Sequence, residues 1–161
     1  KYSTDDTFSP EDILDYVYAV LHQPRYRERY AEFLKIDFPR VPWPEADSFA
    51  DYVRIGGELR QWHLMTHPKI DAHEVSYPND GDNTVDKPKW KDDCVFINKD
   101  QYFAGIEEET WDFHVGSYQP LQKWLKDRTG RDRSFDGLPH YMRIAAALAA
   151  TRELMTELDA L

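Results

Sequence analysis

Side chains that bind phosphate groups and side chains that can read DNA bases occur together in one stretch of this sequence. The phosphate-binding candidates are Lys123, Lys126, Arg128, Arg131 and Arg133, whose charge suits the nucleic-acid backbone. The candidates for base contacts are Ser117, Tyr118 and Gln119, whose hydroxyl and amide groups can hydrogen-bond to base edges. The whole chain holds 20 Lys and Arg against 30 Asp and Glu, a net charge of −10. A basic stretch in an acidic chain predicts a local DNA-binding surface.

The same stretch has a simpler interpretation, a solvent-exposed helix whose lysines and arginines only keep it soluble. A second basic run consists of Arg25, Arg27, Arg29, Lys35 and Arg40, with Glu28, Glu32 and Asp37 between them. We expect this second run to take part in packing and ion pairs rather than in ligand binding.

No residue is predicted to be catalytic or to bind a metal. His63 and His67 are spaced to share a helical face, and His73 follows, an arrangement that could suit zinc. Pro68 directly follows the second histidine, and the glutamate of the zinc-protease motif is missing, so we interpret the segment as a polar helix end. The sequence also has no nucleophile motif and no glycine-rich phosphate loop.

Composition predicts one soluble domain over residues 1–161. Of these residues, 41% are hydrophobic and 14% aromatic, enough to bury a core. Cys94 is the only cysteine, which excludes an internal disulfide and suits the cytoplasm. No apolar run reaches the length of a membrane span. Because the sequence starts at Lys1 without a methionine, we expect it to be part of a longer polypeptide.

Helices are predicted near both ends of the chain. The first begins at Pro10, because Ser9 is a good N-cap and proline suits the first helical position. Apolar spacing predicts further helices over residues 25–35, 48–65, 118–128 and 139–159. Three prolines between residues 38 and 44 impose an extended strap between the second and third helices. Gly56 and Gly57 in the third helix indicate a close contact with another helix.

The middle of the chain lacks helical periodicity. Residues 79–83 have the composition of a turn or a mobile loop. Alternating apolar residues predict strands over residues 94–98, 101–104 and 110–115, the first two joined as a hairpin. We therefore predict an α+β fold in which helices at both ends pack around a small central antiparallel sheet.

Three blocks of the sequence, in order, resemble the C-terminal region of bacterial Type ISP restriction-modification enzymes, which fuse helicase and adenine-N6 methyltransferase modules. The blocks are residues 15–42 (DYVYAVLHQPRYRERYAEFLKIDFPRVP), residues 111–131 (WDFHVGSYQPLQKWLKDRTGR) and a stretch from His140 through Met155 that begins HYMRI. The resemblance spans nearly the whole chain. Ser117 stands before Tyr118 where the family pattern has a second glycine.

The resemblance implies a target-recognition, or specificity, domain that reads DNA sequence while a neighbouring methyltransferase modifies a base. Its expected partners are double-stranded DNA and the methyltransferase and helicase modules of the same polypeptide. S-adenosylmethionine is expected in the methyltransferase module, because this chain lacks an Asn-Pro-Pro-Tyr type motif and a glycine-rich cofactor loop, and the chain alone is expected to be inert. The alternative function is a protein-interaction or scaffolding domain that docks partner modules, which would suit the acidic net charge.

Overall fold

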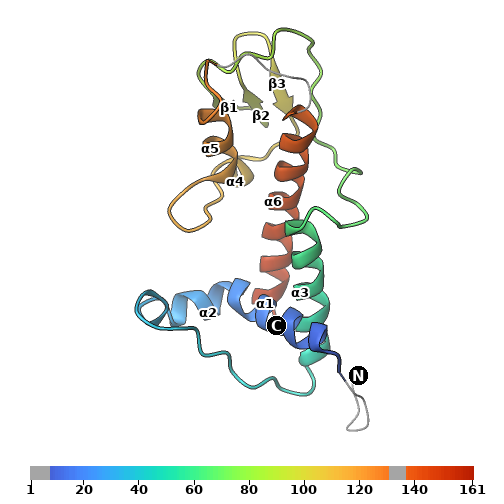
Figure 1. Ribbon diagram of the computed structural model, residues 1–161, viewed down its shortest axis with the longest axis vertical. Helices are drawn as coiled ribbons and strands as arrows, with labels where there is room; N and C mark the ends of the chain where they lie inside the picture. The colour runs from blue at the N-terminus through green and yellow to red at the C-terminus, as the bar shows by residue number, and fades with distance from the viewer. Residues whose placement is uncertain (1–7, 131–136) are drawn as a thin grey trace. The chain divides into compact units, whose positions relative to one another are not determined.

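The computed structural model describes residues 8–130 and 137–161 (Figure 1). In chain order its elements are α1 (Pro10–His22), α2 (Pro24–Arg29), the 3-10 helix η1 (Phe33–Lys35), α3 (Phe49–His63), β1 (Lys89–Lys91), β2 (Cys94–Phe96), β3 (Tyr102–Ala104), α4 (Glu108–Trp111), α5 (Pro120–Lys126) and α6 (Gly137–Asp159). The predicted α+β class, with helices before and after a small antiparallel sheet, is confirmed.

The chain divides into two compact units. The first unit contains the chain up to His67 together with Ala150–Leu161, and the second contains Pro68–Ala149. Helix α6 therefore contributes its first part to the second unit and its last part to the first. Within the described residues, no helix has both the length and the apolar character needed to cross a membrane.

Helix α1 begins where the sequence predicts, at a capping box. The backbone nitrogen of Asp12 donates to the Ser9 hydroxyl at 3.1 Å, and the Ser9 nitrogen donates to the Asp12 carboxylate at 2.7 Å. These bonds satisfy two backbone donors that the first helical turn leaves without partners.

Helices α1 and α3 cross at the two glycines. A Cβ placed on Gly56 would lie 1.9 Å from the carbonyl oxygen of Asp15, so only glycine fits at this position. The side chain of Asp15 is buried and accepts two hydrogen bonds from Arg60, at 2.6 and 2.9 Å. The close helix contact predicted from the paired glycines is confirmed.

The second predicted helix, over residues 25–35, is wrong in its second half. Helix α2 ends at Arg29, and a turn and η1 follow. Tyr26 in α2 is buried, whereas the side chains of Phe33 and Ile36 are 65% and 81% exposed. Tyr30 and Leu34 are only partly buried against the core, so packing stabilises a continuous helix there only weakly.

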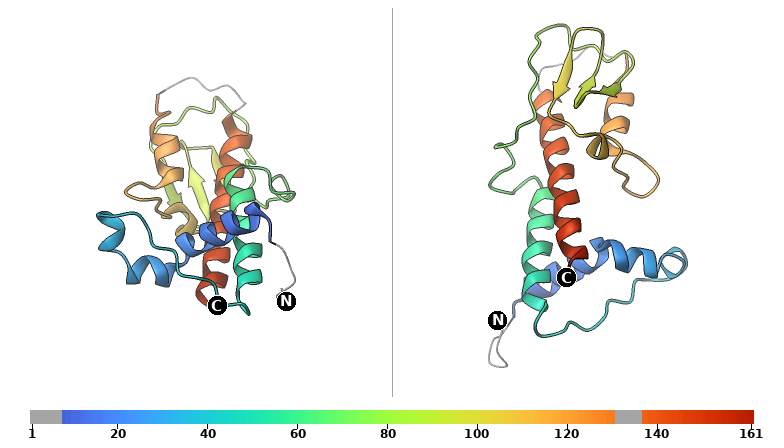
Figure 2. Two further views of the ribbon diagram at one scale, coloured as in Figure 1. Left: turned by 60° about the horizontal axis from the view of Figure 1, so that its bottom comes forward. Right: turned by 180° about the vertical axis from the view of Figure 1, so that it is seen from behind.

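Residues 38–45, which we call the strap, run between η1 and α3 without helix or strand, as their prolines predict (Figure 2). Two buried tyrosines hold the strap to the helices. The Tyr16 hydroxyl donates to the Pro42 carbonyl at 3.0 Å, and the Tyr26 hydroxyl donates to the Arg40 carbonyl at 3.1 Å.

Two clusters of buried side chains form the core of the first unit. One joins α1, α2 and the start of α3 and contains Tyr16, Val20, Tyr26, Phe49 and Val53. The other adds the last part of α6 and contains Ala19, Ile55, Leu59, Leu154 and Leu158. The end of α6 is thus an integral part of this helical unit.

The sheet of the second unit has the order β1-β2-β3, and both pairs are antiparallel. Val95 of β2 lies opposite Trp90 and Phe103, and Val95 and Phe103 are fully buried. The predicted strands over residues 94–98 and 101–104 are confirmed as a shorter hairpin, and β1 was not predicted.

The third predicted strand, over residues 110–115, is wrong. Glu108–Trp111 form helix α4 instead, in which Thr110 and Trp111 are buried, Trp111 as part of the core of the second unit. Acidic residues at its start favour a helix there, because they suit the positive end of the helix dipole. A helical turn therefore buries Trp111 without any strand partner.

The polar loop around residues 79–83 is fixed by one buried amide. Gln101 is 3% exposed, and its Oε1 accepts from the Asn83 nitrogen and from Asn98 Nδ2, both at 2.9 Å. Its Nε2 donates to the Asn79 carbonyl at 3.2 Å and to Asn83 Oδ1 at 2.8 Å. The segment has neither helix nor strand and bends at Gly81, and Gln101 anchors it.

Candidate nucleic-acid interface

A tight turn precedes α5 in the second unit. The Val115 nitrogen donates to the Tyr118 carbonyl at 2.9 Å, and the Tyr118 nitrogen donates to the Val115 carbonyl at 3.4 Å. Gly116 has a φ of 61°, a left-handed conformation that glycine adopts at least cost. Ser117 at the tip is exposed, and Tyr118 is 48% exposed. The turn therefore presents both hydroxyl side chains to solvent.

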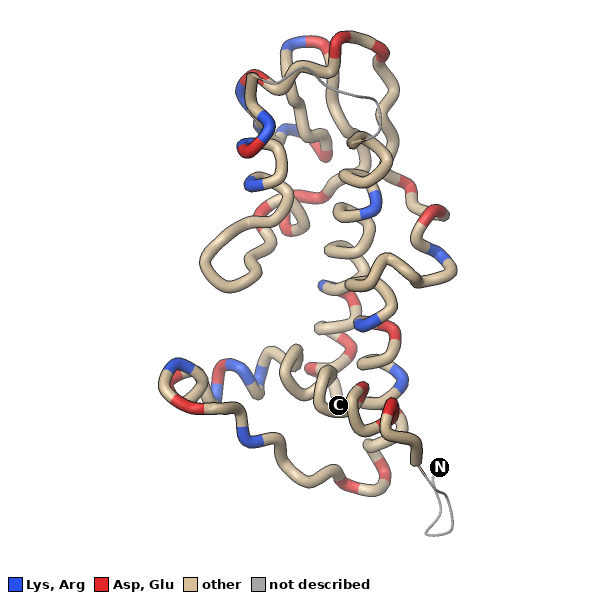
Figure 3. Tube along the Cα trace, viewed as in Figure 1, with Lys and Arg blue, Asp and Glu red and all other residues tan. Residues whose placement is uncertain are grey.

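Helix α5 starts at Pro120, a position that tolerates proline because its missing N–H would have no helical partner. Leu121 and Leu125 are fully buried and anchor one face of the helix in the core of the second unit. Lys123 and Lys126 are exposed on the rest of its surface. Blue segments for Lys and Arg mark this part of the trace in Figure 3.

Among the described residues, the lysines of α5 have weak polar partners at the surface. Lys123 Nζ lies 2.8 Å from Asp127 Oδ2, and the two side chains are 56% and 53% exposed. Lys126 Nζ lies 3.5 Å from Gln122 Oε1. An exposed pair of this kind contributes about 0.5 kcal/mol, so the lysines can exchange these partners for an anion at little cost.

Arg128 is held more firmly than the lysines. Its guanidinium carbon lies 3.6 Å from the centroid of the Trp124 ring, and Nη1 donates to the Trp124 carbonyl at 3.0 Å. The tryptophan therefore orients the guanidinium, which has further N–H groups. The sequence suggested a cation here but not its aromatic support.

Asp112 ties the candidate base-reading residue Gln119 to the start of α5. The amide nitrogens of Gln119 and Gln122 donate to Asp112 Oδ1 at 3.1 and 3.0 Å. Gln119 is thus oriented by a carboxylate at the C-terminal end of α4, and this partly buried residue is less accessible than Ser117 or Tyr118.

Two basic residues of the prediction, Arg131 and Arg133, lie outside the described residues. The same unit also has two lysines that the prediction did not name, Lys89 and Lys91 on the edge strand β1. Lys89 Nζ lies 5.7 Å from the centroid of the Phe96 ring, and Lys91 pairs with exposed Asp92. The alternation Lys-Trp-Lys was the sequence signal from which strand β1 could have been predicted.

The second basic run pairs within the chain, as predicted. Ion pairs link Arg25 to Asp159, Lys35 to Glu32 and Arg40 to Asp37. The other two contacts are of different kinds: Arg27 Nη1 donates to the Leu21 carbonyl, and the Arg29 guanidinium lies over the Tyr30 ring. The run therefore forms intramolecular contacts around α2.

His63 and His67 take part in local packing, and the buried Nδ1 of His73 has no hydrogen-bond partner among the described residues. His63 Nδ1 lies 2.6 Å from the Tyr18 hydroxyl, and His63 Nε2 lies 2.9 Å from Thr151 Oγ1. Burial, with nearby His22, lowers the pKa of His63 to about 4. The His67 ring stacks on Trp62 with centroids 4.1 Å apart. The part of the chain that is described contains no group of three or more His, Cys, Asp or Glu arranged to hold a metal.

Residues 1–157 match the protein family described as the Type ISP C-terminal specificity domain. The chain belongs to this family. No curated protein matches this specificity domain. The family is the C-terminal part of restriction-modification enzymes, as the sequence blocks implied.

Solved structures show the same fold. The ATP-dependent Type ISP restriction-modification enzyme LlaBIII bound to DNA matches 94% of this specificity domain with a TM-score of 0.71 and 21% identity. A nuclease-deletion mutant of the Type ISP enzyme LlaGI in complex with a DNA substrate mimic matches 94%, with a TM-score of 0.67 and 26% identity. A DrdV–DNA complex matches 98%, with a TM-score of 0.72 and 24% identity. This specificity domain spans 12%, 14% and 19% of those three chains, respectively.

Proposed function

We propose that this specificity domain recognises the DNA target of a restriction-modification enzyme and that the turn at residues 115–118, together with α5, faces the duplex. The observation that carries the proposal is the family match over residues 1–157. The similar enzymes LlaBIII and DrdV are bound to DNA, and LlaGI is bound to a DNA substrate mimic.

Phosphate binding is the role we assign to Lys123, Lys126 and Arg128. The lysines are exposed and weakly paired, so a phosphate can replace their present partners. Arg128 is oriented by the Trp124 ring, which lowers the conformational entropy that it would lose on binding. Arg131 and Arg133, which follow along the chain, extend the same proposal.

Base recognition is the role we assign to Ser117, Tyr118 and Gln119. Exposed Ser117 and half-exposed Tyr118 can reach a groove directly. Gln119 must first leave Asp112, and its amide then offers both a donor and an acceptor, the pair that recognises adenine in the major groove. The Asp112 contact would hold Gln119 in place when no DNA is bound.

Catalysis is assigned to another module. We propose that the methyltransferase module of the same polypeptide binds S-adenosylmethionine, that a helicase module accompanies it, and that this domain supplies only target choice. The chain alone, mixed with DNA and labelled S-adenosylmethionine, should transfer no methyl group. Label incorporated into DNA above a protein-free blank would contradict this assignment.

The DNA-facing surface is tested with variants of the full-length enzyme. Lys126→Ala should weaken binding about equally on all sequences and lower the slope of log affinity against log salt by about 0.9. Gln119→Ala should reduce discrimination between target and altered sites by about 1–3 kcal/mol, with little effect on non-specific binding. Affinity is measured by fluorescence anisotropy at several salt concentrations.

Lys35→Ala is the matched control, because Lys35, like Lys126, is an exposed lysine with a partner close by in the sequence, here Glu32 in the first unit. It should leave both the affinity and the salt slope unchanged. If Lys126→Ala and Gln119→Ala both behave like this control, α5 is only a solvated helix and the proposed surface is wrong.

A further inference from the structure

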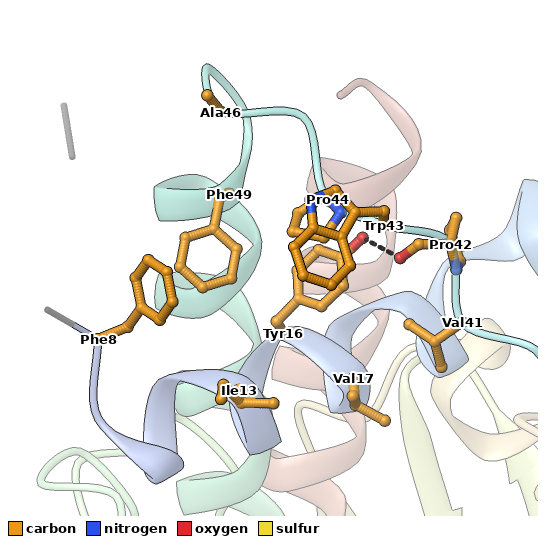
Figure 4. A pocket seen from close by; sticks show the side chains of 10 residues that line it. All are labelled: Phe8, Ile13, Tyr16, Val17, Val41, Pro42, Trp43, Pro44, Ala46 and Phe49. Carbon is orange, nitrogen blue, oxygen red and sulfur yellow. Dashed lines mark hydrogen bonds between the residues drawn. The ribbon is translucent and has the colours of Figure 1, made fainter. Parts of the chain in front are cut away.

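An apolar hollow opens on the first unit, between the start of α1 and the strap (Figure 4). Its volume is about 440 Å³, and its apolar lining includes Phe8, Ile13, Val17, Val41, Trp43 and Phe49. Figure 4 shows Ile13 and Val17 on α1 and Trp43 on the strap facing the same space. The DNA-facing surface proposed above lies in the other unit, so it does not account for this hollow.

The rim of the hollow exposes large apolar side chains to water. Trp43 is 93% exposed, and Phe8 and Ile13 are each 53% exposed. Clustered exposed aromatic and aliphatic residues mark interaction sites more often than scattered ones do. Tryptophan is also among the residues that contribute most to protein–protein binding.

The segments that line the hollow are acidic, which disfavours a nucleic acid as its ligand. Residues 8–17 and 41–51 contain no Lys, Arg or His. Their acids are Glu11, Asp12, Asp15, Glu45, Asp47 and Asp51, and the corresponding part of the trace is marked red in Figure 3. Arg60 neutralises Asp15, whereas Glu11, Glu45, Asp47 and Asp51 are exposed. Such a rim repels phosphates and attracts Lys and Arg.

The hollow is held open by contacts on both of its sides. Tyr16 fixes the strap through the Pro42 carbonyl at 3.0 Å, and the Ser9 capping box fixes the start of α1. The prolines of the strap restrict its backbone further. A partner would therefore meet a preformed surface and would lose little affinity to ordering it.

We propose that this hollow docks an amphipathic segment of the same polypeptide, outside these 161 residues, whose apolar side chains are flanked by Lys or Arg. The similar enzymes offer ample chain for this, because this domain spans only 12–19% of their length. The apolar side chains cover Trp43 and Ile13, and the basic flanks meet Glu45 and Asp47. The hollow thus joins the specificity domain to the rest of its enzyme.

Photo-crosslinking in the full-length polypeptide tests the proposal. Trp43 is replaced by p-benzoylphenylalanine, and crosslinked peptides are identified by mass spectrometry. Leu64, an exposed apolar residue of the same unit that does not line the hollow, receives the same replacement as a control. The Trp43 position should crosslink to a peptide outside the 161 residues that has apolar residues beside Lys or Arg, and the Leu64 position should not.

A charge variant tests the acidic rim. Glu45→Lys with Asp47→Lys should lower the crosslink yield from the Trp43 position by about tenfold, because like charges then face each other. Glu28→Lys with Glu32→Lys, which changes the net charge equally at two exposed positions around α2, should leave the yield unchanged.

Several results would overturn the proposal. They are crosslinks confined to the 161 residues, crosslinks to DNA, the absence of crosslinks, and an undiminished yield in the Glu45 and Asp47 variant. A further experiment mixes heavy-isotope and unlabelled protein before crosslinking. Crosslinks that join a heavy peptide to an unlabelled peptide would show that a second copy fills the hollow, and this result would also overturn the proposal.

Discussion

The guanidinium carbon of Arg128 lies 3.6 Å from the centroid of the Trp124 ring, so one indole supports both the protein core and the basic surface of α5. Trp124 also packs against Tyr141, with ring centroids 5.0 Å apart, and lies next to Gly137. The position of the cation therefore depends on the packing of the core beneath it.

Trp124→Ala should lower the free energy of unfolding by about 3 kcal/mol, because it removes a large side chain packed against the core. Arg128→Ala removes the stacked cation and its hydrogen bond to the Trp124 carbonyl, but no large core side chain, and should cost about 1 kcal/mol. Urea titration of the two variants measures both losses. Equal losses would show that Trp124 contributes little beyond its contact with the arginine.

Gly56→Ala should lower the free energy of unfolding by about 3 kcal/mol or more, because backbone atoms of α1 must move to admit the methyl group. The new Cβ would lie 1.9 Å from the Asp15 carbonyl oxygen. Gly57→Ala is the control. In this control the added Cβ would lie 3.0 Å from a side-chain oxygen of Asp15, which can move more easily than backbone. Gly57→Ala should therefore lower the free energy of unfolding by less than Gly56→Ala, and the higher helix propensity of alanine should offset this loss by about 1 kcal/mol. Thermal or urea unfolding that ranks the two variants in the opposite order would contradict the observed crossing.

Acid should destabilise the first unit through His63. Burial lowers the pKa of His63 from 6.5 to about 4, so between these pH values the unfolded chain binds a proton that the folded chain excludes. The stability from neutral His63 is therefore complete above pH 6.5 and declines as the pH falls toward 4. His63→Gln should flatten the pH dependence of the unfolding free energy in this window.

The control for the loss of one imidazole is His114→Gln, since His114 is exposed in the other unit. Urea titrations at several pH values between 4 and 7 compare the three proteins. A steep pH dependence retained in His63→Gln would assign the acid sensitivity to other groups.

Tyr141→Phe should leave stability unchanged or raise it by up to about 1 kcal/mol, because the buried hydroxyl has no hydrogen-bond partner among the described residues. Tyr16→Phe is the contrasting variant. It removes a hydroxyl that donates to the Pro42 carbonyl and should cost about 1 kcal/mol. A loss at Tyr141 as large as that at Tyr16 would reveal a partner for the Tyr141 hydroxyl.

The sequence predicted elements whose signals are local. Ser9 and Pro10 mark the start of the first helix, which the structure confirms, and the strap follows directly from its prolines. The helix predicted over residues 118–128 is confirmed as the shorter α5. The segment over residues 110–115 was misassigned because Trp111 is buried equally well by strand alternation and by a helical turn. A strand over these residues would need a neighbouring strand to pair with. The local sequence pattern cannot show whether such a partner is present.

The candidate site was predictable in composition but not in geometry. The basic character of α5 is visible in Lys123 and Lys126. The contact of Gln119 with Asp112 and the stacking of Arg128 on Trp124 require side-chain orientations that spacing does not specify. The role of these residues in DNA binding stays a prediction.

The strap exposes aromatic side chains in a form that resists aggregation. Pro39, Pro42 and Pro44 have no N–H to donate, and tyrosine hydroxyls already occupy the Arg40 and Pro42 carbonyls. A growing β-sheet needs alternating donors and acceptors along an edge, and this segment cannot supply them. Its apolar surface can therefore remain exposed before a partner binds without acting as a template for cross-β assembly.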